Sequence, residues 1–249
     1  MKLNVFFITF PLITCTFFFN SNNIFAQGTA SDSSFYQKAL INTMDVYHQS
    51  FGDQSALYNG SRYGEYLYKF KEGDPYFYSP APVAGTVIYD GIKYDNILMR
   101  YDQIIDELII NDQANRIQLL KAKVQYFNLY NADFIQIKKN SLVNNLISSG
   151  FYNLLYKGKI CLLKKEIKIS KDELSIGTEL QISIEGNDYY YIKKDDKFYP
   201  IKNKGKLFDV FKDKKSEVQQ FIKANDLNFK RDRQNMLTKT TAYYDSLKK

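Results

Sequence analysis

The sequence predicts an α+β protein: an antiparallel β-meander with an N-terminal helix before it and a C-terminal pair of helices after it. The 249 residues include 21 Tyr and 19 Phe but no Trp, and aromatic residues favour strands. Two-residue turn signals separate short apolar runs in the middle of the chain, whereas three- and four-residue apolar spacing marks both ends. The hydrophobic share of 45% and charged share of 24% exclude wholesale disorder and collagen-like structure.

Residues Met1–Ala26 have the layout of a secretory signal peptide. Lys2 is their only charge, and the apolar run Val5–Phe19 follows it. A charged start, a short apolar run and a small-residue cleavage site are typical of export signals. We expect cleavage after Ala26 and a protein that is not integral to the membrane afterwards; the alternative is an uncleaved anchor. Loss of Lys2 takes the formal charge from +7 to +6.

Residues 27–204 are predicted to hold the N-terminal helix and the β-rich domain. Apolar spacing predicts the helix over Ser33–Ser50, with the single histidine, His48, near its end. A zinc site with two His ligands is therefore excluded. Cys161 is the only cysteine after the predicted cleavage site, so we expect no intramolecular disulfide and interpret it as a small buried hydrophobe.

The zone Leu57–Lys202 is dense in strand signals. Asp90-Gly91 lies between two apolar runs, which is a strong hairpin signal. We expect further breaks at Asn111-Asp112, Asn131-Ala132, Lys157-Gly158, Gly186-Asn187 and Asp195-Asp196. Connections this short pair sequential strands antiparallel. The sequence leaves open whether the meander partly closes like a barrel and whether the break at Ser141–Gly150 divides it into two subsheets.

Residues 205–249 return to helical spacing and are predicted to pack on the sheet or on each other. One apolar stripe runs from Leu207 to Ile222, and a second runs from Met236 to Leu247. Lys193–Lys249 contains 16 basic and 8 acidic residues. The excess charge is either the solvated side of amphipathic helices or a contact for an acidic glycan, a lipid surface or an envelope protein. Export and the lack of a binding motif argue against nucleic acid.

The pattern Tyr-Asp-x-Ile occurs three times and gathers carboxylates in one stretch of the chain. Candidate acidic residues here are Asp90, Asp95, Asp102, Asp106 and Glu107. Three interpretations remain: turn-forming Asp residues flanked by strand Tyr residues, a calcium site, or a pair of carboxylates hydrolysing a glycoside. The spacing does not fit an EF-hand loop, and we predict no metal site and no cofactor.

An aromatic segment rich in Gly and Pro precedes these repeats. Its tyrosines Tyr63, Tyr66, Tyr68, Tyr76 and Tyr78 are the candidate binding residues. Tyr supplies contact area with a polar tip, so exposed rings on loops suit a binding surface such as a platform for sugars. The alternative is that these rings cover one end of the sheet.

Common enzyme signatures are absent from the sequence. It has no G-x-S-x-G, no phosphate-binding G-x-x-x-x-G-K-[ST], no G-x-G-x-x-G and no H-E-x-x-H. We predict an exported, non-enzymatic binding or interaction module of the cell envelope, periplasmic, secreted or associated with the outer membrane. The alternative is a carboxylate-dependent glycan hydrolase.

Several segments resemble a set of exported proteins of the Bacteroidetes group of bacteria. They are Phe25–Gln27, Val87–Gly91, Gly150–Leu163, Leu227–Lys230 and Tyr243–Leu247. The resemblance covers most of the chain after the signal and rests on turn and packing patterns. It implies export and carries no activity and no functional residues.

Overall fold

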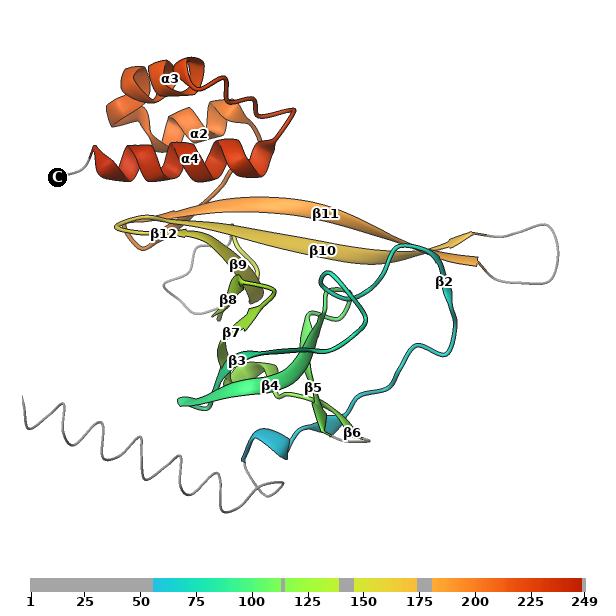
Figure 1. Ribbon diagram of the computed structural model, residues 1–249. Coiled ribbons are helices and arrows are strands. Elements are labelled where there is room, and N and C mark those ends of the chain that lie inside the picture. Colours follow the sequence, from blue (N-terminus) through green and yellow to red (C-terminus); the bar gives the residue numbers. More distant parts are fainter. Residues whose placement is uncertain (1–55, 113–114, 139–145, 174–180, 248–249) are drawn as a thin grey trace, which may run out of the picture. The chain divides into compact units, whose positions relative to one another are not determined.

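The computed structural model describes residues 56–112, 115–138, 146–173 and 181–247 (Figure 1). All of them belong to one compact unit, Asp53–Lys249. The predicted signal peptide Met1–Ala26 and the predicted helix Ser33–Ser50 with His48 lie outside the described residues.

Within the described ranges, twelve strands form a single sheet. The strands are β1 (Ser61–Arg62), β2 (Phe70–Glu72), β3 (Val83–Tyr89), β4 (Ile92–Asp102), β5 (Glu107–Asp112), β6 (Asn115–Gln118), β7 (Val124–Leu129), β8 (Ala132–Ile137), β9 (Gly150–Lys157), β10 (Cys161–Glu173), β11 (Gln181–Lys194) and β12 (Lys197–Pro200). Short 3-10 turns lie at Ala56–Tyr58, Lys121–Lys123 and Lys212–Lys214.

The strands neighbour one another in the order β1-β6-β5-β4-β3-β7-β8-β9-β10-β11-β12, and β2 adds a short parallel pairing to β11. The antiparallel prediction is confirmed along this path. Sequential pairing is broken at both β1 and β2, which pair with β6 and β11. It is broken again at β7, which pairs with β3 and not with β6. This arrangement places Lys123 beside the first hairpin, where its carbonyl accepts a hydrogen bond of 2.8 Å from the backbone N–H of Asp90.

The described strands show neither barrel closure nor division into two subsheets. β9 pairs with β8 from Ile137↔Gly150 to Phe134↔Asn153, so the break at Ser141–Gly150 does not divide the sheet. The sheet ends at β1 on one side and β12 on the other. Closure into a barrel would require the two edge strands to pair, and they do not.

Local turn chemistry explains most of the hairpins. Asp90–Gly91 and Asp195–Asp196 have positive φ at both residues, which is the geometry of the type I′ turns that match strand twist, and both predictions are confirmed. The turn predicted at Asn131-Ala132 lies one residue earlier, at Tyr130–Asn131. The break at Gly186-Asn187 is wrong, because both residues are paired with β10 inside β11.

Two further breaks coincide with strand ends. β9 ends at Lys157, as the break at Lys157-Gly158 predicts. β5 ends at Asp112, within the break predicted at Asn111-Asp112, and residues 113–114 lie outside the described residues.

Three helices follow the sheet, where the sequence predicts two. They are α2 (Lys204–Val210), α3 (Lys215–Ala224) and α4 (Arg233–Ser246). The first predicted stripe divides at Phe211, the C-cap of α2, and a 3-10 turn separates α2 from α3. The buried Phe211 ring stacks on Tyr244 at a centroid distance of 3.9 Å. Among the described residues, no helix combines the length and apolar character needed to span a bilayer.

The sheet is packed on two main clusters of side chains. One cluster lies against strands β3 to β9 and includes Val87, Met99 and Phe127. The other joins the helices to β10 and β11 and includes Leu162 and Ile192. The helices therefore cover one face of the long β10–β11 hairpin (Figure 1).

Candidate functional site

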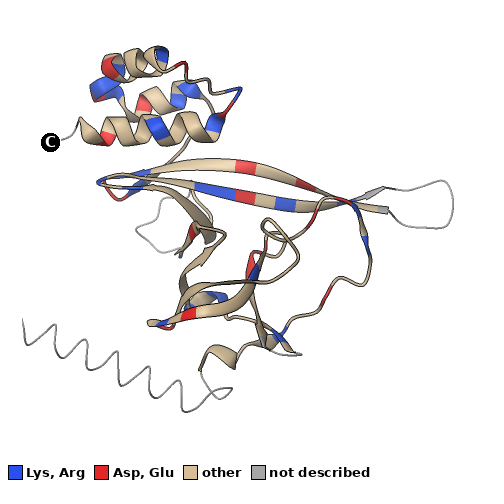
Figure 2. Ribbon diagram, in the orientation of Figure 1, with Lys and Arg blue, Asp and Glu red and all other residues tan. Residues whose placement is uncertain are grey.

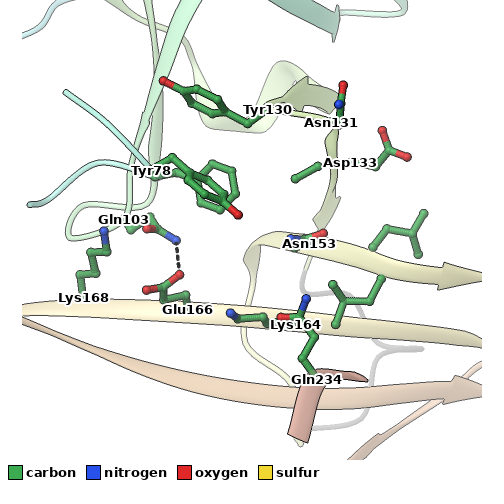
Figure 3. A pocket seen from close by; sticks show the side chains of 14 residues that line it. Tyr78, Gln103, Tyr130, Asn131, Asp133, Asn153, Lys164, Glu166, Lys168 and Gln234 are labelled. Atoms are coloured by element: carbon green, nitrogen blue, oxygen red, sulfur yellow. Dashed lines mark hydrogen bonds between the residues drawn. The ribbon is translucent and has the colours of Figure 1, made fainter. Parts of the chain in front are cut away.

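A cleft of about 580 Å³ opens beside the β7–β8 turn, between that turn and the strands β9 and β10. Its volume falls in the range of about 300–1,000 Å³ that is usual for small-molecule sites. Figure 3 shows the side chains that line it. They are Phe77, Tyr78, Gln103, Tyr130, Asn131, Ala132, Asp133, Asn153, Leu154, Leu155, Lys164, Glu166, Lys168 and Gln234.

Two tyrosine rings form one wall of the cleft. Tyr78 is 77% exposed, and its ring centroid lies 5.3 Å from that of Tyr130. Phe77 supports both rings, at 4.7 Å from Tyr78 and 6.2 Å from Tyr130. A large apolar ring left open to solvent is typical of a contact surface.

Both of these tyrosines have left-handed backbone, with φ of 63° at Tyr78 and 51° at Tyr130. A side chain with a Cβ is disfavoured there by about 1–2 kcal/mol relative to the ordinary regions. Tyr130 occupies the first central position of its type I′ turn, where Asn, Asp or Gly is usual. Strain of this kind concentrates at functional sites, so the rings are held in place at a measurable cost in stability.

Side-chain amide groups also line the cleft. Gln103 is 4% exposed, and its Nε2 donates to Glu166 Oε2 at 3.3 Å, as the dashed line in Figure 3 marks. Its Oε1 is buried and has no hydrogen-bond partner among the described residues. Asn153 also has no side-chain hydrogen bond within the described ranges. A ligand could therefore donate to Gln103 and bond Asn153.

The charged groups around the cleft already have protein partners. Lys164 pairs with Asp188 at 3.0 Å. Lys168 donates to the carbonyls of Asp74 at 2.9 Å and Tyr76 at 2.6 Å, and burial lowers its pKa.

Asp133, on β8 just after the Tyr130 turn, accepts from Tyr126 at 2.6 Å and Asn128 at 2.7 Å. With these groups satisfied, the remaining hydrogen-bonding capacity of the cleft lies in its amides and in the Glu166 carboxylate, for which the described residues show one hydrogen bond, from Gln103.

The sequence-predicted tyrosines fall into two groups. Tyr63, Tyr66 and Tyr76 turn inward around Asp102, which is fully buried. Tyr63 and Tyr66 donate to Asp102 Oδ2 at 2.8 and 2.9 Å, and the Tyr63 and Tyr76 hydroxyls lie 3.0 Å apart. Burial raises the pKa of Tyr63 and Tyr66 far above the ordinary value and that of Tyr76 to about 12. This cluster covers the end of β4.

The other two predicted tyrosines are exposed. Tyr68 is 44% exposed and lies outside the cleft lining. Tyr78 belongs to the cleft wall. Binding by these five residues stays a prediction, and the structure separates the one that lines the cleft from those that pack around Asp102.

The carboxylates of the Tyr-Asp-x-Ile repeats do not converge on the cleft. Asp90 pairs with Lys123 at 2.8 Å and Asp95 with Lys93 at 2.6 Å, both on exposed turns or strands. Asp106 accepts from Lys165 at 3.0 Å, and Glu107 pairs with Lys121 at 3.1 Å. Among the described residues, no group of three or more His, Cys, Asp or Glu side chains is placed to hold a metal ion.

Sequence reasoning missed Tyr130, Gln103, Asn153 and Glu166. They come from four segments far apart in the chain and meet only because β9 and β10 fold beside the β4–β5 and β7–β8 turns. One local signal was present: Tyr130 comes directly before the predicted Asn131-Ala132 turn, and its ring is 39% exposed.

The chain matches no protein-family model, no curated protein and no solved structure.

Proposed function

We propose that this chain is an exported, non-enzymatic binding module of the cell envelope that holds a neutral saccharide in the Tyr78–Tyr130 cleft. The observation that carries the proposal is that two exposed, backbone-strained rings share one cavity of ligand size with the buried Gln103 Oε1, which has no hydrogen-bond partner among the described residues.

A saccharide fits this chemistry on both sides of the cleft. Its C–H faces pack against aromatic rings, as Tyr78 and Tyr130 offer. Its hydroxyls can donate to the free Oε1 of Gln103 and bond the amide of Asn153. Burying the Oε1 of Gln103 without a hydrogen-bond donor is unfavourable by about 1–3 kcal/mol, and a bound hydroxyl would remove that penalty.

Export and the envelope location rest on the N-terminal sequence. The layout of Met1–Ala26 and the resemblance to exported proteins of the Bacteroidetes group support them. An envelope protein of that kind meets glycans, which agrees with the cleft chemistry.

Screening the purified protein on a panel of oligosaccharides, followed by titration calorimetry, tests the proposal. Tyr78→Gly and Tyr130→Asn each remove a ring while accepting left-handed φ, so the fold is retained. We expect each to weaken binding of the best oligosaccharide by at least about tenfold, because truncated central contacts usually reduce affinity by that much or more.

Tyr189→Ala is the matched control, because Tyr189 is 46% exposed on β11 and lies outside the cleft lining. Tyr68→Ala tests the aromatic segment in the same way. The proposal fails if no oligosaccharide binds the unaltered protein, or if Tyr189→Ala weakens binding as much as the cleft variants do. Release of reducing ends that disappears in Glu166→Gln would contradict the non-enzymatic part.

A further inference from the structure

A second cavity, of about 590 Å³, lies where β11 meets the segments that precede α2 and α4. It is lined by Asp188, Tyr190, Lys202, Asn203, Phe229, Lys230 and Arg233. Figure 2 shows Lys and Arg on all three helices and on the segment before α4. The cavity is therefore set in the most basic part of the chain.

Two aromatic rings hold the guanidinium of Arg233 in place. Its central carbon lies 4.8 Å from the ring centroid of Phe229 and 5.7 Å from that of Tyr190. No carboxylate pairs with Arg233 within the described ranges. Stacking on rings uses the flat face of a guanidinium and leaves its N–H groups, which lie in the plane, free to donate.

The balance of charge around this cavity is positive. Lys202 and Lys230 line it, and neither has an ion-pair partner among the described residues. The lining carboxylate of Asp188 is committed to Lys164 at 3.0 Å and to the Tyr190 hydroxyl at 3.3 Å. Asp232 is close by but caps α4 by accepting from the Asn235 N–H at 3.0 Å. Three cations thus share a cavity whose nearest acids already have partners.

We propose that this cavity binds the phosphate group of a phosphorylated sugar. A guanidinium fork matches phosphate oxygens and two ammonium groups add charge, which suits a dianion better than a single carboxylate. The volume exceeds that of a bare phosphate, so the cavity has room for the organic part. This site is separate from the neutral cleft and does not depend on it.

Titration calorimetry with glucose 6-phosphate tests the site directly. We expect saturable binding that weakens as salt is added, and no comparable binding of glucose or glucuronate. Arg233→Ala should weaken binding by at least about tenfold, because a hydrogen bond between charged groups is among the stronger kinds. Arg233→Lys should recover part of the loss, since it keeps the charge without the fork.

Arg231→Ala is the control, because Arg231 is a neighbouring arginine that pairs with Asp226 at 2.8 Å and does not line the cavity. An unchanged urea midpoint for Arg233→Ala shows that the variant is folded, and Lys230→Ala provides a second variant at an exposed lining residue. Glucuronate binding as tightly as glucose 6-phosphate, no saturable binding, or equal losses in Arg231→Ala and Arg233→Ala would each overturn the proposal. Arg233-dependent binding to phosphatidic acid vesicles without binding of glucose 6-phosphate would overturn the sugar as the source of the phosphate.

Discussion

At the scale of single residues, the side chains at positions of positive φ fall into two kinds: short polar ones in hairpin turns, and tyrosines that line the cleft. Asp90 and Asp195 have positive φ in hairpin turns, where a short polar side chain tolerates this conformation. Tyr78 and Tyr130 have no such tolerance, and both line the cleft. Gly150, with φ of 136°, occupies a region that is essentially closed to other residues.

Gly150 also makes room for a buried ion pair, which gives a prediction. A Cβ at this position would fall on the Asp106 carboxylate and the Lys165 ammonium, whose atoms pair at 3.0 Å. Burial already lowers the pKa of Lys165, so losing its partner leaves a charge in a poor environment. We expect Gly150→Ala to lower the free energy of unfolding by about 2–4 kcal/mol, measured by urea denaturation.

Gly64→Ala is the comparison, because its Cβ would meet nothing within 4 Å. It should change the unfolding free energy by less than about 0.5 kcal/mol. Equal effects from the two substitutions would show that the Asp106–Lys165 pair contributes little.

At the scale of elements, the aromatic segment before β3 is fastened to the end of β4. Asp102 accepts from two tyrosine hydroxyls and, through Oδ1, from the backbone N–H of Ile104 at 2.9 Å. Arg100 adds a cation over the Tyr76 ring at 4.4 Å and pairs with Glu65. A buried carboxylate with several donors is stable only while the donors remain, so this cluster sets the position of the segment that delivers Tyr78 to the cleft.

Tyr63→Phe tests the structural role of this cluster. It removes one donor from buried Asp102, so we expect the free energy of unfolding to fall by about 1–3 kcal/mol. Tyr68→Phe, at an exposed ring, should stay within about 0.5 kcal/mol of the unaltered protein. Urea denaturation of both variants measures the two effects. An unchanged free energy of unfolding for Tyr63→Phe would contradict the structural role of the cluster around Asp102.

The β10–β11 hairpin contributes to both cavities. Lys164 on β10 lines the cleft, Asp188 on β11 lines the second cavity, and their side chains pair at 3.0 Å. This single pair lowers the free positive charge of the cleft and the free negative charge of the second cavity. The two sites thereby suit different ligands, one neutral and one anionic.

At the scale of the whole molecule, tyrosine burial links stability to alkaline pH. Burial raises the pKa of Tyr63, Tyr66 and Tyr101 above the ordinary 10.0 and that of Tyr126 and Tyr152 to about 12. Above pH 10 the unfolded chain loses these protons while the folded chain keeps them. Stability is therefore fully present below pH 10 and is lost as the pH rises further.

We expect the urea midpoint to fall steeply once the pH passes the ordinary tyrosine pKa of about 10. Burial lowers the pKa of Lys165 and Lys168, so these two lysines make the folded state more stable as the pH rises towards their ordinary pKa of 10.5. The buried tyrosines with raised pKa values outnumber them, so the net effect is a loss of stability. Tyrosinate absorbance recorded in the same samples should lag behind that of free tyrosine until unfolding. A flat midpoint, or tyrosines that all ionise near pH 10, would contradict this account.

Local information in the sequence determined the antiparallel strands, the hairpins at Asp90–Gly91 and Asp195–Asp196, and the helical end of the chain, because turn chemistry and apolar periodicity act between near neighbours. Tertiary structure alone decided that β7 pairs with β3, that Phe211 divides the first helical stripe, and that Tyr63 is buried while Tyr78 is exposed. It also brought Tyr130, Gln103 and Glu166 to one cleft. These outcomes depend on contacts between residues far apart in the chain. The periodicity of one segment shows which of its faces is apolar, but it does not show which distant segment packs against that face.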